Sequence, residues 1–484
     1  MPRKASLTSD KADLVFRPFI VATTLEKEDA ETRKLIRSHV MRGKNKGKKM
    51  PRAPQRSKAD AQEAPPASRV LIKNEETQWT FVSPRNITSQ FSLSGFSEEF
   101  DHKMQKLVHE AFTVVKPITY AILDVFGKKI DGQNDLFCYS NLSIHPAMVP
   151  SLLFSVQAFR DMAMGVQIGH DANFYLAKAL HFLQKSINSK KDATSYATMV
   201  VITSLASAST LLGEFETAGK HLDGLHRVLE VRGGIESLDP GDMVVHKART
   251  IDLGLAMGTG SPTRFAHDLS WSPQIAIGKA ASHMPELDII TPRPDPRLLN
   301  IWVDLRELSR MANEAKLTRV TMPMEIFSRV STSIPYRLVH LKFSPMSITE
   351  LLRFCMMAYT KSLLVRIKGL AKRMFYMAEG LDMSLQLHTP ATADSAEFLL
   401  WALFIATISI FEDLERPWLR RRLLETLSTL GLRTWPETRD VLKKFLWVDP
   451  LHDDAAKMLF YQLMIPRPED IETICPAVLN EKQI

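Results

Sequence analysis

Cysteine is a common metal ligand and nucleophile, and the cysteines of this sequence are isolated from one another. Cys138, Cys355 and Cys475 lie more than a hundred residues apart, whereas a zinc site needs Cys and His at short spacing. Their odd number and wide separation also argue against a disulfide framework and are typical of a reducing compartment. Cys355 lies in the apolar run LLRFCMMAY, which predicts an inert core residue.

Two groups of histidines are candidates for metal or acid–base chemistry. The consecutive residues His452, Asp453 and Asp454 offer ligand atoms, but they follow an Asp-Pro turn, which is typical of an acidic helix N-terminus. His221 and His226 are five positions apart in a predicted helix, so they point in different directions. We therefore expect both groups to be ordinary helix residues.

Phosphate-binding and hydrolytic motifs are also missing. Gly254, Gly258 and Gly260 match neither the G-x-x-x-x-G-K nor the G-x-G-x-x-G spacing, so we expect a flexible loop there. The sequence has no G-x-S-x-G elbow and no H-E-x-x-H motif. These observations predict a protein that is not an enzyme and that uses no metal or cofactor.

The excess of Lys and Arg is confined to one short segment. The formal net charge is +8, yet residues 33–58 hold eleven Lys or Arg and no acid, which leaves 51 basic against 54 acidic residues elsewhere. A run of like charge favours contact with a polyanion or a receptor. The candidate contact residues are Arg33, Lys34, Arg37, Arg42, Lys44, Lys46, Lys48, Lys49 and Arg52.

Three interpretations of this basic segment stay open. A nuclear import receptor reads a short run rich in Lys and Arg. The same side chains could neutralise the phosphates of a nucleic acid and so release its counterions, and a solubilising tail would need no partner. Residues 33–58 contain no Phe, Tyr or Trp, which argues against stacking on single-stranded bases.

Composition divides the chain into an N-terminal arm and a helical body. Residues 1–68 combine the basic arm and a Pro-rich linker with one short helix at about 25–42. Residues 69–100 carry scattered aromatics, which indicate a segment that docks on the body. The body is predicted to span 101–484, with a Pro-rich break at about 240–296.

Helical periodicity dominates the body and predicts an all-α fold, a large array of antiparallel helix pairs. The central pair is expected at 193–238, where a helix that is apolar nearly all round precedes one with an apolar stripe of Ala218, Leu222, Leu225 and Leu229. A helix without a polar face must be buried, so we expect this pair to hold the body together. Helices are predicted at 101–114, 117–126, 149–164, 171–187, 193–212, 215–231, 243–256, 297–314, 347–378, 393–412, 417–430, 436–447 and 453–463.

Local signals predict several helix ends. Gly213 separates the two helices of the central pair. Pro417 suits the first turn of a helix that ends at Gly431, and Thr434 with Glu437 has capping-box spacing. The apolar stretch 398–411 is too short to span a bilayer, so we expect a soluble protein without a membrane partner.

At the central pair the sequence resembles a known family. HLDGLHRVLEVRGGIESL, at 221–238, is similar to a motif of the fungal-specific transcription factor regulatory domain, in which a capped helix ends in an Arg-Gly-Gly turn. VLKKFLWVDPLHDDAAKMLF at 441–460 and IRSHVMRGKNKGKK at 36–49 resemble further segments of that family. The matched residues, expected to be structural, are His221, Leu222, Gly224, Leu225, Arg232, Gly233, Gly234 and Trp447.

The resemblance implies an all-helical regulatory domain in a nuclear transcription regulator, with an import receptor and a transcription factor or the transcription machinery as partners. The family's binuclear zinc cluster needs closely spaced cysteines, which this sequence lacks. The basic arm would then serve for import or for weak, non-specific DNA contact. The alternatives are a cytoplasmic helical scaffold or interaction module and, with less support, a small-ligand receptor or enzyme that uses a pocket in the helical core.

Overall fold

The computed structural model describes residues 101–115, 121–127, 142–266, 269–278, 294–318, 321–364 and 373–466, together with residues 287, 290, 369 and 370. They belong to one compact unit, Phe100–Ile484, which we call the body. The predicted arm helix, the Pro-rich linker and the docking segment all lie outside the described residues.

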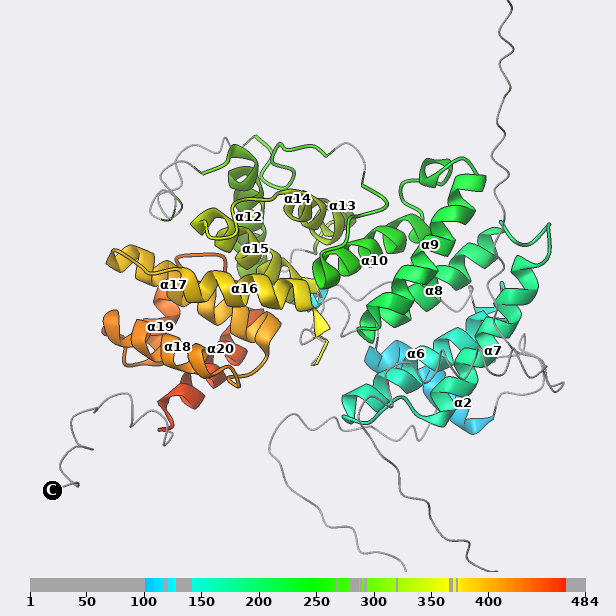
Figure 1. Cartoon of the computed structure of the whole chain (residues 1–484), viewed down its shortest axis with the longest axis horizontal. Coiled ribbons are helices and arrows are strands. Elements are labelled where there is room, and N and C mark those ends of the chain that lie inside the picture. The colour runs from blue at the N-terminus through cyan, green and yellow to red at the C-terminus, as the bar shows by residue number, and fades with distance from the viewer. Residues whose placement is uncertain are drawn as a thin grey trace, which may run out of the picture. The chain divides into compact units, whose positions relative to one another are not determined.

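Every regular element in the described part of the body is helical, which confirms the prediction of an all-α fold (Figure 1). Short π-helical or 3₁₀ turns, labelled η, continue or follow several helices. In chain order the elements are α2 (His102–Glu110), η2 (Ala111–Val115), α4 (Ala121–Val125), α6 (Met148–Ala163), α7 (His170–Ile187), α8 (Tyr196–Leu211), α9 (Phe215–Val231), η3 (Ile235–Ser237), α10 (Met243–Thr259), α12 (Pro296–Thr318), α13 (Met324–Ser328), η4 (Arg329–Ser333), α14 (Ile334–His340), α15 (Ile348–Leu364), α16 (Phe375–Leu387), α17 (Ala393–Ala406), η6 (Thr407–Phe411), α18 (Pro417–Thr429), α19 (Trp435–Leu442) and α20 (Asp449–Met464).

The helices predicted within 193–238 are present as α8 and α9, which pack against each other. Ser195 caps α8, its hydroxyl accepting a hydrogen bond from the Thr198 backbone N–H at 3.2 Å. As predicted, α8 is buried on nearly all sides. Gly213, with φ of 70°, makes the turn to α9 in a left-handed conformation that suits glycine.

The helix α10 confirms the helix predicted at 243–256 and extends it to Thr259, into the glycine-containing stretch where the sequence predicted a flexible loop. Gly254 and Gly258 lie inside α10, and Gly260 is its left-handed C-cap with φ of 73°. The loop prediction is wrong because these glycines serve close packing. A Cβ at Gly258 would lie 2.7 Å from the Phe215 ring of α9, so only a residue without a side chain lets the two helices approach.

The second half of the body has a core of its own around α15 and α17. Trp302 of α12 and Trp401 of α17 meet edge to face with ring centroids 5.8 Å apart, and Phe445 stacks on Trp401 at 5.6 Å. Trp401 is fully buried, and its Nε1–H donates to the Leu446 carbonyl at 2.9 Å. The first half of the body is built around the pair α8–α9, which packs with α6, α7 and α10.

One apolar stretch is longer than the sequence interpretation allowed. Within the described residues, Ala393–Phe411 is long and apolar enough to cross a membrane, judged by length and composition alone. Its most apolar window is 78 % buried inside the body, as in the core helix of a soluble protein. The burial therefore accounts for its apolar character.

Two helix predictions in the region 324–387 need correction. The single helix expected at 347–378 is two helices, because α15 ends at Leu364 and α16 begins at Phe375, with Gly369 between them at φ of 85°. The elements α13, η4 and α14 were not predicted. Pro335 lies in the first turn of α14, a position that tolerates proline.

The predicted capping signals in the C-terminal part are confirmed. The Thr434 hydroxyl accepts from the Glu437 N–H, while the Glu437 carboxylate accepts from the Thr434 N–H at 3.0 Å. Pro417 lies in the first turn of α18, and Gly431 follows that helix with φ of 67°. These helix ends depend on interactions between residues that are close in sequence, so the sequence alone predicts them.

Two glycine-to-alanine substitutions should change stability in opposite directions. A Cβ at Gly380 of α16 would overlap the Phe354 ring of α15, so Gly380→Ala should lower the free energy of unfolding by about 1–3 kcal/mol. Nothing lies within 4 Å of a Cβ added at Gly224 of α9, so Gly224→Ala should raise it by about 0.5–1 kcal/mol through better helix propensity. Denaturant unfolding of both variants measures the difference, and a loss of stability in both would contradict this packing.

Candidate functional site

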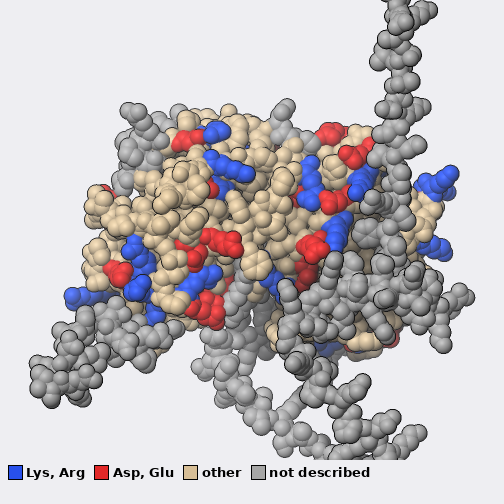
Figure 2. Space-filling model, viewed as in Figure 1, with Lys and Arg blue, Asp and Glu red and all other residues tan. Residues whose placement is uncertain are grey.

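The nine candidate residues of the basic arm lie outside the described residues, so their geometry is not part of the structure. On the face of the body shown in Figure 2, Lys and Arg are interspersed with Asp and Glu. Many charged side chains of the described residues are paired; Arg310, for example, contacts Glu307 at 2.7 Å and Glu314 at 2.5 Å. This mixed surface agrees with the nearly balanced charge of the chain outside 33–58.

The family-like residues of α9 support the pair α8–α9. Leu222 and Leu225 are fully buried. The Arg232 guanidinium donates to the Thr194 carbonyl at 2.7 Å, which joins the end of α9 to the residues before α8. After Arg232 the chain turns through Gly233 and Gly234, whose φ values of 102° and 93° require glycine-like freedom, and the Gly234 N–H closes the helix by donating to the Leu229 carbonyl at 2.8 Å.

Trp447, the remaining family-like residue, has a separate structural role. It lies between α19 and α20, is 2 % exposed, and donates from Nε1 to Asp453 at 2.9 Å. Its carbonyl accepts from the Asn313 side chain of α12 at 3.0 Å. Figure 1 shows α9 and α19 in different parts of the body, so the structure does not bring the motif residues together in one site.

The run His452–Asp454 lies in the first turns of α20, as the sequence predicted. His452 Nδ1 accepts from the Val448 N–H at 2.9 Å, so the ring proton is on Nε2, which contacts the Ser362 hydroxyl at 2.9 Å. A nucleophilic serine would need an unprotonated Nε2 as its base. The hydrogen bonds of this buried Ser–His pair are therefore those of a structural contact and not those of a nucleophile with its base. Among the described residues no cluster of His, Cys, Asp or Glu could hold a metal ion.

Ser186 and His145 form a second Ser–His pair with the same hydrogen-bond arrangement. His145 Nδ1 accepts from the Ala147 N–H at 3.0 Å, and its Nε2 contacts the Ser186 hydroxyl at 2.8 Å. Burial lowers the pKa of His145, which favours the neutral ring. The proton again lies on Nε2, the atom that a general base would need free.

Asp304 and Arg337 form a buried ion pair. Both side chains are fully buried, with Nη2 and Oδ2 2.7 Å apart. Asp304 also accepts from the backbone N–H groups of Gln274, Ile275 and Ala276, so it fastens that loop to α12. The pair was not predicted, because its partners lie far apart in sequence.

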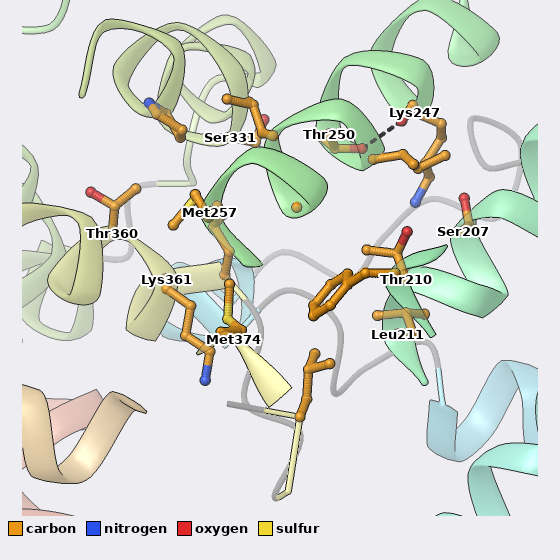
Figure 3. Close-up of a pocket in the computed structure, with 17 residues that line it drawn as sticks. Ser207, Thr210, Leu211, Lys247, Thr250, Met257, Ser331, Thr360, Lys361 and Met374 are labelled. Carbon is orange, nitrogen blue, oxygen red and sulfur yellow. Dashed lines mark hydrogen bonds between the residues drawn. The ribbon is translucent and has the colours of Figure 1, made fainter. Parts of the chain in front are cut away.

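A cavity of about 150 Å³ lies between the two halves of the body (Figure 3). It is partly open to solvent, and its walls come from α8, α9, α10, η4, α14 and α15, together with Leu370 and Met374. The lining residues are Ser207, Thr210, Leu211, Phe215, Lys247, Thr250, Ile251, Leu253, Gly254, Met257, Ser331, Pro335, Thr360, Lys361, Leu364, Leu370 and Met374.

The sequence interpretation missed this cavity, although one signal was present. Lys247, Thr250, Ile251 and Gly254 are spaced to share one face of α10. These residues fall within the helix predicted at 243–256, but only the structure shows that this helix packs against both α8 and α14.

No protein-family model, no curated protein and no solved structure matches this chain.

Proposed function

We propose that this protein is a nuclear transcription-regulator-like protein that acts through its helical body and has no zinc-cluster DNA-binding domain in this sequence. The observation that carries the proposal is the confinement of the excess positive charge to residues 33–58, next to a body whose charge is balanced. The resemblance of 221–238 and 441–460 to the fungal regulatory domain supports the same assignment. The arm binds an import receptor and, secondarily, makes weak, non-specific DNA contact.

The body, in this proposal, is an array of antiparallel helix pairs that binds another transcription factor or the transcription machinery. The contacts of α8 with α9 and of α6 with α7 support this architecture. The body has no catalytic role. The tautomers of His145 and His452 support this, because neither ring offers a free Nε2 to its serine.

Replacement of Lys44, Lys46, Lys48 and Lys49 by Gln should abolish nuclear accumulation of the tagged full chain, because an import receptor recognises clustered positive charge. The matched control replaces four exposed lysines of the body, Lys185, Lys190, Lys191 and Lys457, and should stay nuclear. Fluorescence microscopy measures the nuclear fraction. A wild-type protein that stays cytoplasmic, or an arm variant that still accumulates in the nucleus, would contradict the proposal.

DNA contact by the arm is tested separately by its salt dependence. The logarithm of the binding constant should fall with the logarithm of salt concentration, with a slope of about 0.9 for each phosphate contacted. Deletion of 33–58 should remove that slope. Absence of binding at low salt would restrict the arm to import.

The second candidate function is a cytoplasmic scaffold, favoured by an exposed apolar face on α16. Phe375, Met383 and Leu387 are 62 %, 46 % and 48 % exposed and share one face of that helix. Such a face is typical of a surface that binds another protein. Co-purification with a cytoplasmic partner that depends on these three residues, in cells where the protein is excluded from the nucleus, would favour this function.

A further inference from the structure

The cavity beside α10 has walls that are apolar even where Ser or Thr lines it. Each Ser or Thr among the described lining residues, except Ser207, donates its hydroxyl hydrogen to a backbone carbonyl three or four positions earlier, at 2.8–2.9 Å; these residues are Thr210, Thr250, Ser331 and Thr360. Their hydroxyls are therefore satisfied without a ligand. Most other lining side chains are hydrocarbon or thioether, such as Phe215, Ile251 and Met257.

The charged side chains of the lining already have partners within the protein. No Asp or Glu occurs among the described residues that line the cavity, so a bound cation would find no counter-charge there. Lys361 Nζ donates to the Ser409 carbonyl of η6 at 2.8 Å. Lys247 also has an interaction partner within the protein. Because burying an unpaired charge is costly, the cavity favours a neutral ligand.

One hydroxyl group of the lining is left unsatisfied. The Ser207 hydroxyl oxygen of α8 is buried and makes no hydrogen bond to the described residues. Figure 3 shows Ser207 beside Thr210 at one end of the cavity, with Met257 and Met374 toward the other. A buried hydroxyl without a partner costs free energy until a partner is supplied. Ser207 is therefore the point at which a ligand in this apolar space gains a hydrogen bond.

We propose that this cavity binds a compact neutral molecule with an apolar body and one hydroxyl group, such as a small aromatic alcohol. The ligand hydroxyl bonds to Ser207, and the apolar body lies against Phe215, Ile251 and Met257. A cavity of about 150 Å³ accommodates about one benzene-sized ring. The apolar walls supply most of the affinity by removing the ring from water, and the hydrogen bond selects the hydroxyl. This site is independent of the arm and of the nuclear role proposed above.

Titration of the full chain with benzyl alcohol, benzoate and benzylamine tests the proposal without a variant. Benzyl alcohol should bind saturably with one-to-one stoichiometry, and about tenfold or more tighter than either charged compound, because their charges would be buried without a partner. The ring of the bound alcohol should shift the methyl NMR signals of Met257 and Met374, which line the cavity. The control is Met458 of α20, which is 52 % exposed, does not line the cavity and should show no saturable shift.

Two serine variants of α8 then test the polar contact. Ser207→Ala should weaken benzyl alcohol binding about three- to tenfold and leave toluene binding within about twofold, because it removes the hydrogen bond and keeps the apolar walls. The matched control is Ser204→Ala. Ser204 donates to the Val200 carbonyl at 2.7 Å and does not line the cavity, so this variant should bind both compounds like the wild type.

Any of four results would overturn the inference. Absence of saturable benzyl alcohol binding would make the cavity a packing void. Binding that leaves the Met257 and Met374 methyl signals unchanged would place the ligand elsewhere. Benzoate or benzylamine that binds as tightly as benzyl alcohol would contradict a neutral ligand. Undiminished benzyl alcohol binding by a folded Ser207→Ala variant would contradict the hydrogen bond to Ser207.

Discussion

Asp304→Asn should lower the free energy of unfolding by about 3–5 kcal/mol, because it leaves the charge of Arg337 buried without a counter-charge. The Arg337 guanidinium is fully buried, and Asp304 is the carboxylate that it contacts, at 2.7 Å. The substitution also replaces one of the oxygens that hold the backbone N–H groups at 274–276. We therefore expect loss of the loop and of the α12–α14 contact together.

Denaturant unfolding of the full chain measures this effect, with Asp295→Asn as the matched control. Asp295 pairs with Arg297 at 2.8 Å, but the Arg297 side chain is half exposed, so the control should lose no more than about 1 kcal/mol. Equal losses in the two variants would contradict a special role for the buried pair. Replacement of both Asp304 and Arg337 by apolar residues should cost less than Asp304→Asn alone, because no unpaired charge remains.

Acidification from pH 6.5 to about 4 should destabilise the protein through His221. Burial lowers the pKa of His221 from 6.5 to about 4, so in this range the unfolded chain binds a proton that the folded protein does not. Stability is therefore present above pH 6.5 and is lost as pH falls, by on the order of 2–3 kcal/mol at a rate of about 1.4 kcal/mol per pH unit. Burial also lowers the pKa of His145 and of His388, which adds to the same trend.

His221→Gln should remove the part of this pH dependence that belongs to His221, because glutamine does not titrate. The free energy of unfolding, measured at several pH values, should fall less steeply in this variant than in the wild type. His170→Gln is the control, since the side chain of His170 is 93 % exposed and meets water in both states. An unchanged slope in His221→Gln would show that the pKa of His221 is the same in the folded and the unfolded protein, contrary to this prediction.

Local chemistry in the sequence predicted much of the fold. The start of α19 follows from Thr434 and Glu437, whose reciprocal hydrogen bonds involve only residues within one turn. The turn after α9 follows from Gly233 and Gly234, since positive φ values favour glycine there. The span of α9 follows from the period of its apolar stripe.

Other features depend on residues that meet only in the folded chain. Gly254 and Gly258 indicate a loop by their sequence, but in the structure they let α10 pack against Thr210 and Phe215. The break between α15 and α16 was hidden because both flanking segments have helical periodicity. The pairing of Asp304 with Arg337 spans more than thirty residues and has no spacing rule.

The sequence by itself determined an all-α body, most of its helix ends, and a charge imbalance confined to residues 33–58, because composition, caps and periodicity act locally. The tertiary structure alone decided which polar groups are buried and which of them meet. It placed α10 along the cavity and brought Asp304 of α12 into contact with Arg337 of α14. A cavity is the space left after distant side chains pack, so the order of residues along the chain does not reveal it.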